Sequence, residues 1–254
     1  MKVVRTIAEL EQSPGTGLVP TMGALHAGHA ALLRAARAEN ERVVMSLFVN
    51  PAQFDVEADL AAYPRDEARD LGLAEAEGVD VVFAPSAGEL YGKGFATWIE
   101  PAATGAEGDA RPGHFRGVAT VCLKLFNLVR PERAYFGQKD AQQVAVLRRL
   151  VRDLDVPVEI RVVPTVRDPD GLALSSRNLL LSPDERERAL GLSRALESAA
   201  AAADPVAAAR ASLKGLDPDY VELVDLGGAT VLAAAVRVGS TRLLDNVLVE
   251  GEIR

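Results

Sequence analysis

Short runs of valine, isoleucine and leucine alternate with helical patterns from the N-terminus to Val166, and this alternation restricts the fold more than any other feature. Predicted strands occupy residues 42–49, 79–85, 133–137 and 158–165, and residues 18–20 end an earlier strand. Predicted helices lie between them at 29–39, 65–77, 117–129 and 141–154. Nearly continuous apolar strands separated by helices indicate a parallel sheet covered on both faces. We therefore predict a doubly wound, Rossmann-like α/β domain over residues 1–166.

The pattern changes after residue 166, where helices precede strands. Residues 182–203 are predicted to form a helix that Ser182 caps, and a second helix is expected over 205–215. Three further strands are predicted at 220–226, 234–239 and 241–250. Helices followed by a run of strands are typical of an α+β unit. Residues 167–254 are therefore predicted to form a smaller C-terminal α+β domain.

Charge and composition argue against several classes of protein. The formal net charge of −8 disfavours the basic face that binds nucleic acid. No apolar run is long enough for a membrane span, and the N-terminal residues lack the apolar core of a secretory signal. The single cysteine, Cys122, suits a reducing cytoplasm, and one cysteine with three histidines is too few for a structural zinc site. We expect a cytoplasmic protein with no nucleic-acid or membrane partner.

Two of the three histidines lie in the segment PTMGALHAGHAALL (20–33), which follows the first strand and opens the first helix. The free N–H groups of a helix N-terminus favour anions. His26 and His29 flank Gly28 and could add donors for a phosphate chain. The segment matches neither the dinucleotide-binding glycine pattern nor a Walker loop. Taken alone, it would also be explained by two ordinary turn histidines beside a capping glycine.

A second candidate phosphate-binding segment is VRDPDGLALSSRN (166–178). Ser175 and Ser176 offer hydroxyls, and Arg177 offers a guanidinium that can hold two phosphate oxygens. The same residue types are also good loop material, so this segment alone does not establish a site.

Two more polar segments follow predicted strands. YFGQKDAQQ (135–143) contains Lys139, Asp140 and Gln143, and FVNPAQF (48–54) contains the uncharged amides Asn50 and Gln53. Open α/β sheets bind ligands at the carboxyl ends of their strands. Several such segments in one chain therefore predict a ligand site at that edge of the sheet.

These motifs carry a specific resemblance. HAGH resembles the HxGH signature of the nucleotidyltransferase superfamily that includes class I aminoacyl-tRNA synthetases, and SSRN resembles its mobile phosphate-binding loop. The ordered set PTMGALHAGH, FVNPAQF, RPGHFRGV, FGQKD-x-QQ and DGLALSSRN resembles the pantothenate synthetase (pantoate–β-alanine ligase) family. The resemblance implies the HxGH type of Rossmann-like fold. It also implies ATP-dependent condensation of (R)-pantoate with β-alanine to give pantothenate, AMP and pyrophosphate, through a pantoyl adenylate. A homodimer that uses ATP with Mg²⁺ and no prosthetic group is expected.

The resemblance also assigns residues. The implied ATP-binding residues are Met22, Gly23, Ala24, Leu25, His26, Ala27, Gly28, His29, Gly137, Gln138, Lys139, Asp140, Val166, Leu174, Ser175, Ser176 and Arg177. The implied catalytic residues among them are His26, His29, Lys139, Ser175, Ser176 and Arg177. The implied residues for pantoate and β-alanine are Asn50, Gln53, Arg111, His114 and Gln143, with Arg111 and His114 in a glycine-rich lid. Asp70 matches a Mg²⁺-binding carboxylate, and an ordinary helix acid would explain it equally well.

The chain departs from the family pattern where Leu174 replaces a methionine, Gln138 replaces a glutamate and Arg69 replaces a carboxylate beside Asp70. None of these changes removes a proposed reactive group. The alternatives are another HxGH nucleotidyltransferase, which would need a cationic pocket for a second phosphate, and an inactive nucleotide-binding homologue. ATP binding without turnover would identify the inactive homologue.

Overall fold

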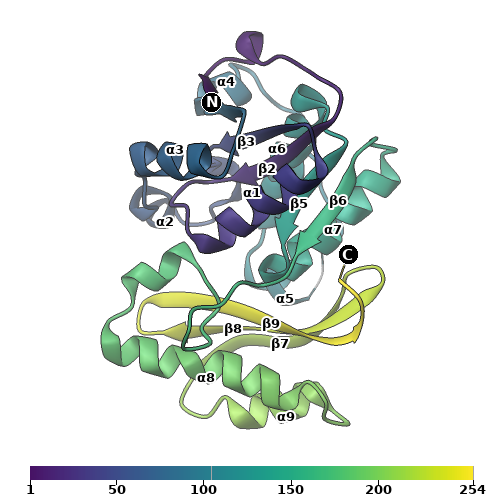
Figure 1. The fold of residues 1–254 in the computed structure, drawn as a ribbon. Coiled ribbons are helices and arrows are strands. Elements are labelled where there is room, and N and C mark those ends of the chain that lie inside the picture. The colour runs from purple at the N-terminus through teal and green to yellow at the C-terminus, as the bar shows by residue number, and fades with distance from the viewer. Residues whose placement is uncertain (104, 254) are drawn as a thin grey trace.

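Six parallel strands form the larger sheet of the computed structural model, which describes residues 1–103 and 105–253 (Figure 1). The strands are β1 (Lys2–Val4), β2 (Thr16–Thr21), β3 (Arg42–Leu47), β4 (Val81–Phe83), β5 (Arg133–Gly137) and β6 (Glu159–Val163). They lie in the order β1-β4-β3-β2-β5-β6, and every neighbouring pair is parallel. The chain builds outward from β2 through β3 to β4 and then returns to place β5 on the other side of β2. The carboxyl ends of β2 and β5 therefore flank the point where a doubly wound sheet binds its ligands.

Helices cover both faces of this sheet. The helices of this part of the chain are α1 (Ala27–Glu39), α2 (Glu57–Ala62), α3 (Glu67–Ala76), α4 (Ala87–Leu90), α5 (Ala106–Ala110), α6 (His114–Val129) and α7 (Ala141–Asp153), and the covering ones include α1, α3, α6 and α7. Alternate residues of β2 face opposite sides, as the strand geometry requires. Leu18 joins the core that includes α6 and α7, whereas Val19 joins the core that includes α1 and α3. Four short 3-10 turns lie at Ile7–Glu9, Pro51–Gln53, Gln138–Asp140 and Ser176–Leu180.

The C-terminal part contains a second, antiparallel sheet. Its elements are α8 (Pro183–Ala199), α9 (Pro205–Ser212), β7 (Asp217–Asp225), β8 (Ala229–Val238) and β9 (Thr241–Gly251), with strand order β7-β8-β9. The central strand β8 is buried on both faces: Val231 and Ala233 pack into the core of the larger sheet, whereas Leu232 and Ala234 pack with α8 and α9. In Figure 1 the small sheet accordingly lies between the two helices and the parallel-sheet layer.

The predicted fold class is confirmed, with a doubly wound parallel sheet and a small α+β C-terminal part. The division at residue 166 stays a prediction. The edge strand β1 and the short helices α2, α4 and α5 were not predicted. Within the described residues, no helix combines the length and hydropathy that a membrane crossing requires.

The helix predicted for 182–203 ends earlier, at Ala199. Pro205 disfavours a helical conformation at Asp204. The Asp204 side chain instead caps α9 by accepting a hydrogen bond from the Ala207 N–H at 2.9 Å. The alanines at 200–203 therefore belong to the turn between two helices, in spite of their helix propensity.

Candidate active site

A cavity of about 260 Å³ opens at the carboxyl ends of β2 and β5, where the fold predicts a ligand site. The lining residues from the predicted ATP set are Met22, His26, Gly28, His29, Gly137, Lys139, Asp140, Val166, Leu174, Ser175, Ser176 and Arg177. The lining residues from the predicted acid-binding set are Asn50, Gln53, Arg111, His114 and Gln143. Segments that are far apart in the sequence thus meet around one space.

The two histidines of the HAGH segment are fixed by bonds within the segment. His26 precedes α1, and its Nδ1 accepts a hydrogen bond from the Gly28 N–H at 3.1 Å. The Nδ1 of His29 accepts from the His26 N–H at 3.2 Å. A neutral imidazole that accepts at Nδ1 carries its proton on Nε2. Each ring is therefore held with an N–H donor on its other nitrogen.

Burial keeps both rings uncharged. It lowers the pKa of His26 to about 4, assisted by the nearby Lys139 ammonium, and lowers the pKa of His29 to about 3, assisted by His26. At neutral pH these side chains are therefore neutral donors. When a phosphate chain enters the cavity, its negative charge will favour the protonated form of each ring.

Asp70 holds the turn that leads into this segment. Its side chain is 1% exposed, and its two oxygens accept hydrogen bonds from the Ala24 N–H at 2.9 Å and the Leu25 N–H at 2.7 Å. The turn is tight, with φ of 87° at Gly23 and 52° at Ala24. A Cβ at residue 23 would lie 2.9 Å from the Asp70 carboxylate, so this position favours glycine.

The predicted role of Asp70 as a Mg²⁺ ligand stays a prediction. Asp70 does not line the cavity, and both of its oxygens are already engaged by backbone N–H groups. In the described part of the chain, no cluster of three or more histidine, cysteine or acidic side chains could hold a metal ion.

The other predicted phosphate-binding groups line the same cavity as the histidines. Lys139 and Asp140 lie in the 3-10 turn after β5, with 3.5 Å between the Lys139 ammonium and the Asp140 carboxylate. Ser175 caps the turn Ser176–Leu180 by accepting from the Arg177 N–H at 3.3 Å. The Tyr63 hydroxyl hydrogen-bonds Ser176, and burial raises the pKa of this phenol. Sequence reasoning missed Tyr63, although it lies just before the predicted helix at 65–77.

An amide pair, Asn50 and Gln53, also lines the cavity. The Asn50 amide donates to Gln53 Oε1 at 2.9 Å and to the Gly117 carbonyl at 3.2 Å, and Asn50 Oδ1 accepts from the Tyr91 hydroxyl at 2.8 Å. Asn50 is only 1% exposed. Because its side chain is fully engaged, Asn50 orients Gln53 and leaves the Gln53 NH₂ group as a donor toward the cavity.

Arg111 and His114 close over this amide pair. Arg111 donates to the Gln53 carbonyl oxygen at 3.1 Å and to Asp55 at 3.2 Å. His114 Nδ1 lies 2.9 Å from the same carbonyl, which can only accept, so this nitrogen carries the proton. Burial, together with the Arg111 charge, lowers the pKa of His114 to about 4. Both predicted lid residues therefore contact the segment that carries Gln53.

Several predicted ATP-site residues support the cavity without lining it. They are Gly23, Ala24, Leu25, Ala27 and Gln138. Leu25 is a core residue, and the Gln138 side chain bonds Asn246 and the Thr165 N–H instead of facing the cavity. Asn246, which does line the cavity, comes from the C-terminal sheet and was not predicted.

Comparisons with known proteins show similarity along nearly the whole chain. A family model described as "Pantoate-beta-alanine ligase" matches residues 1–248. The chain is 50% identical to the pantothenate synthetase of Roseiflexus castenholzii over 277 aligned positions, which cover 98% of this chain and all of the relative. It is 51% identical to the enzyme of Chloroflexus aurantiacus, with 99% of each chain covered.

Solved structures show the same likeness. Pantothenate synthetase from Thermus thermophilus superposes with a TM-score of 0.92 at 45% identity, covering 98% of this chain and 99% of the other. The pantoate–β-alanine ligase of Francisella tularensis, solved with a β,γ-ATP compound and β-alanine, gives a TM-score of 0.85 at 36% identity with both chains fully covered.

Proposed function

The chain belongs to the pantoate–β-alanine ligase family and is an enzyme that condenses pantoate with β-alanine using ATP, and we propose that it does so through a pantoyl adenylate formed in the cavity described above. One observation carries this proposal. Groups suited to phosphates and groups suited to a hydroxy acid line the same cavity. The surroundings of His26, His29, Lys139 and Ser175–Arg177 are called its phosphate end, and the surroundings of Gln53 and Gln143 its acid end.

The proposed chemistry proceeds in two steps. A pantoate carboxylate oxygen attacks the α-phosphorus of ATP, the bond to the bridging oxygen breaks, and pyrophosphate leaves with the bonding electrons. The β-alanine amine then attacks the acyl carbon, AMP leaves, and the amine loses a proton. The carboxylate is thereby converted into an acyl group with a good leaving group. The protein need form no covalent bond and acts by positioning and by stabilising charge.

At the phosphate end, His26 and His29 would donate from Nε2 to the charge that develops on the α-phosphate and the departing pyrophosphate. Lys139 would supply a positive charge, and Arg177 a guanidinium that can grip two oxygens. Ser175 and Ser176 would add hydroxyl donors, and Asp140 would accept from the ribose hydroxyls. These groups are brought to the cavity by three separate segments.

At the acid end, Gln53 and Gln143 would bind the carboxylate and hydroxyls of (R)-pantoate. A neutral amide can hydrogen-bond both kinds of group and avoids the desolvation cost of burying a second charge. Asn50 would act by orienting Gln53, and Arg111 and His114 by holding the Gln53 backbone. Closure of this end would keep water away from the adenylate.

We assign Mg²⁺ to the substrate, as the ion that accompanies the ATP phosphates, and assign no protein ligand to it. Asp70 is assigned to the turn that it holds. We further propose a homodimer, which light scattering at micromolar protein concentration would test, since twofold dimers are the commonest oligomers. A reducing cytoplasm is also proposed, because Cys122 is free and buried.

Isotope transfer tests the intermediate. Pantoate labelled with ¹⁸O in its carboxylate should deliver one ¹⁸O atom to AMP, because its oxygen bonds to the α-phosphorus. Labelled inorganic phosphate formed together with ADP would instead indicate attack on the terminal phosphorus and would reject the adenylate. Unlabelled pantoate in ¹⁸O-water is the control for exchange with solvent.

A further inference from the structure

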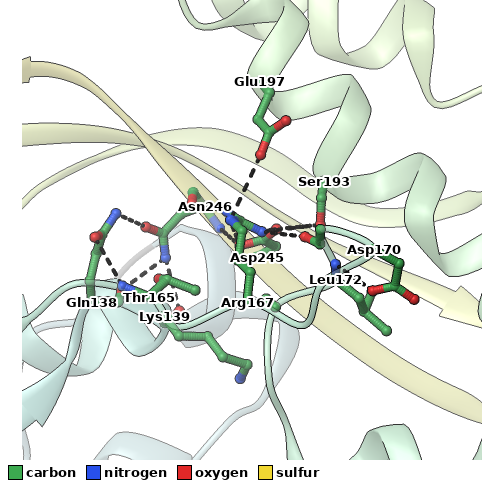
Figure 2. A network of polar contacts seen from close by, with 12 residues as sticks. Gln138, Lys139, Thr165, Arg167, Asp170, Leu172, Ser193, Glu197, Asp245 and Asn246 are labelled. Atoms are coloured by element: carbon green, nitrogen blue, oxygen red, sulfur yellow. Dashed lines mark hydrogen bonds and ion pairs between the residues drawn. The ribbon is translucent and has the colours of Figure 1, made fainter. Parts of the chain in front are cut away.

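We propose that Asp245 and Asn246 of β9 are positioning residues that hold the Lys139 turn and the Ser175–Arg177 loop in a fixed relation across the nucleotide end of the cavity. The proposal rests on the proposed function of those two segments in binding ATP. Figure 2 shows the network, in which Asn246 contacts Gln138 and Lys139, and Asp245 contacts Arg167, which lies upstream of the serine loop.

Asn246 contacts the Lys139 turn. Its NH₂ group donates to the carbonyl oxygens of Gln138 and Lys139, both at 2.9 Å, and its Oδ1 accepts from the Gln138 side chain at 3.0 Å. Gln138 Oε1 in turn accepts from the Thr165 N–H at 3.3 Å. Asn246 is 1% exposed, so these bonds replace all contact with bulk water. One buried side chain thus fixes two successive peptide groups at the turn that carries Lys139.

Asp245 contacts the start of the loop that carries the serines. Its carboxylate accepts from both terminal nitrogens of Arg167, at 2.7 and 3.1 Å, and from the Ser193 hydroxyl at 2.7 Å. It also accepts from the Asn246 N–H at 2.8 Å. The carboxylate is thus buried with a charged partner and fully hydrogen-bonded, the arrangement that makes a buried charge tolerable.

Arg167 transmits this contact to the loop. Its guanidinium donates to the Gly171 carbonyl at 3.2 Å, and Arg167 pairs with Ala173 in an isolated antiparallel bridge. The next residue, Leu174, donates its N–H to the Val166 carbonyl at 3.0 Å. This short hairpin ends directly before Ser175. The position of the loop is therefore set from the same β9 dipeptide that fixes the Lys139 turn.

Two phosphate-binding segments on independent loops would have to be ordered together when ATP binds. Ordering both segments costs conformational entropy. Because the β9 contacts order them before ATP arrives, this cost is lower and the nucleotide binds more tightly. The acid end of the cavity has its own supports, Asn50, Arg111 and His114, and within residues 1–103 and 105–253 no hydrogen bond joins these to Asp245 or Asn246. Loss of the β9 contacts should therefore weaken ATP binding and spare pantoate binding.

The test compares Asn246→Ala with the matched variant Asn40→Ala. Asn40 is also buried, and its NH₂ group donates to the Ala36 carbonyl and the Tyr135 hydroxyl at 2.7 and 2.6 Å, but it caps the C-terminus of α1, two residues before β3, at the opposite end of the sheet. ATP and pantoate binding would be titrated calorimetrically at a temperature where both variants are folded. We expect Asn246→Ala to raise the ATP dissociation constant at least about tenfold and the pantoate constant less than about threefold. Asn40→Ala should change neither by more than about threefold while lowering the melting temperature comparably.

Equal weakening of both ligands by Asn246→Ala, or equal weakening of ATP by both variants, would overturn the proposal. If Asn246→Ala does not fold, Arg167→Lys is the second variant. Lysine keeps the positive charge beside Asp245 but cannot make the two hydrogen bonds to its carboxylate together with the bond to the Gly171 carbonyl. We therefore expect the same selective weakening of ATP binding. Unchanged ATP binding would contradict the proposal. This test measures ATP binding and does not depend on the reaction. Wild-type protein that binds ATP but fails to transfer ¹⁸O to AMP would contradict the adenylate mechanism, and the binding test of Asp245 and Asn246 would still apply.

Discussion

The Nδ1 atom of His29 accepts a hydrogen bond from the backbone N–H of His26, and this contact places the proton of His29 on Nε2. The ring is also neutral at physiological pH, since burial lowers its pKa to about 3. His29 therefore enters the reaction as a fixed N–H donor. It becomes a cation only where a bound phosphate supplies the compensating charge.

Replacing His29 with alanine should reduce the rate of adenylate formation about a hundredfold or more, on the order of 3 kcal/mol in the barrier. The donor acts on charge that grows in the transition state, so the turnover number should fall more than the affinity for ATP. Steady-state ATP–pyrophosphate exchange measures both quantities. A loss below tenfold would refute the role given to His29.

Gln53→Ala should weaken pantoate binding far more than ATP binding. The alanine removes the amide donor at the acid end and leaves the phosphate end, which other segments build, unchanged. Asn50→Ala should act on pantoate through the same amide, so the double variant should lose less than the sum of the two single losses. Separate titrations of the two substrates measure this, and equal losses for ATP and pantoate would contradict the assignment.

Asp70→Asn should reduce activity by a factor that does not depend on Mg²⁺ concentration. An asparagine can accept only one of the two N–H bonds that now hold the turn at Ala24 and Leu25. Asp66→Asn is the control. Asp70 lies in α3, and the Asp66 carboxylate caps the N-terminus of that helix from outside the cavity. A defect that high Mg²⁺ repairs would show instead that Asp70 binds the ion.

The free energy of unfolding should fall as the pH drops from about 6.5 towards 4. Burial lowers the pKa of His26 and His114 to about 4 and that of His29 to about 3. In this window the unfolded chain binds protons at histidines that stay neutral in the folded enzyme, so stability rises with pH by up to about 1.4 kcal/mol per pH unit for each group.

Denaturant unfolding of the wild type and His114→Gln between pH 7 and 4.5 measures this dependence. The variant lacks one of the three groups, so its curve should be less steep, and the stability difference between the two proteins should narrow as the pH falls. Parallel curves would show that His114 is not kept neutral by burial.

The HAGH site could be predicted from the sequence because its geometry is local. The bonds that fix His26 and His29 join residues two and three positions apart at the start of one helix. The strands of the parallel sheet were predictable for a related reason, since burial on both faces leaves a continuous apolar run.

Features that depend on distant partners could not be predicted. Asp245 and Asn246 look like ordinary strand residues, but their partners Arg167 and Gln138 lie 78 and 108 positions away. Strand β8 was predicted only from residue 234, whereas it begins at Ala229. Packing on both faces of the strand determines its structure here.

The most direct measurement is ATP–pyrophosphate exchange with Mg²⁺, with and without (R)-pantoate, in the absence of β-alanine. An adenylate intermediate predicts exchange that appears only when pantoate is present, because the first step must run in both directions without the amine. Folded protein that binds ATP and pantoate but shows no exchange would contradict adenylate formation in this cavity.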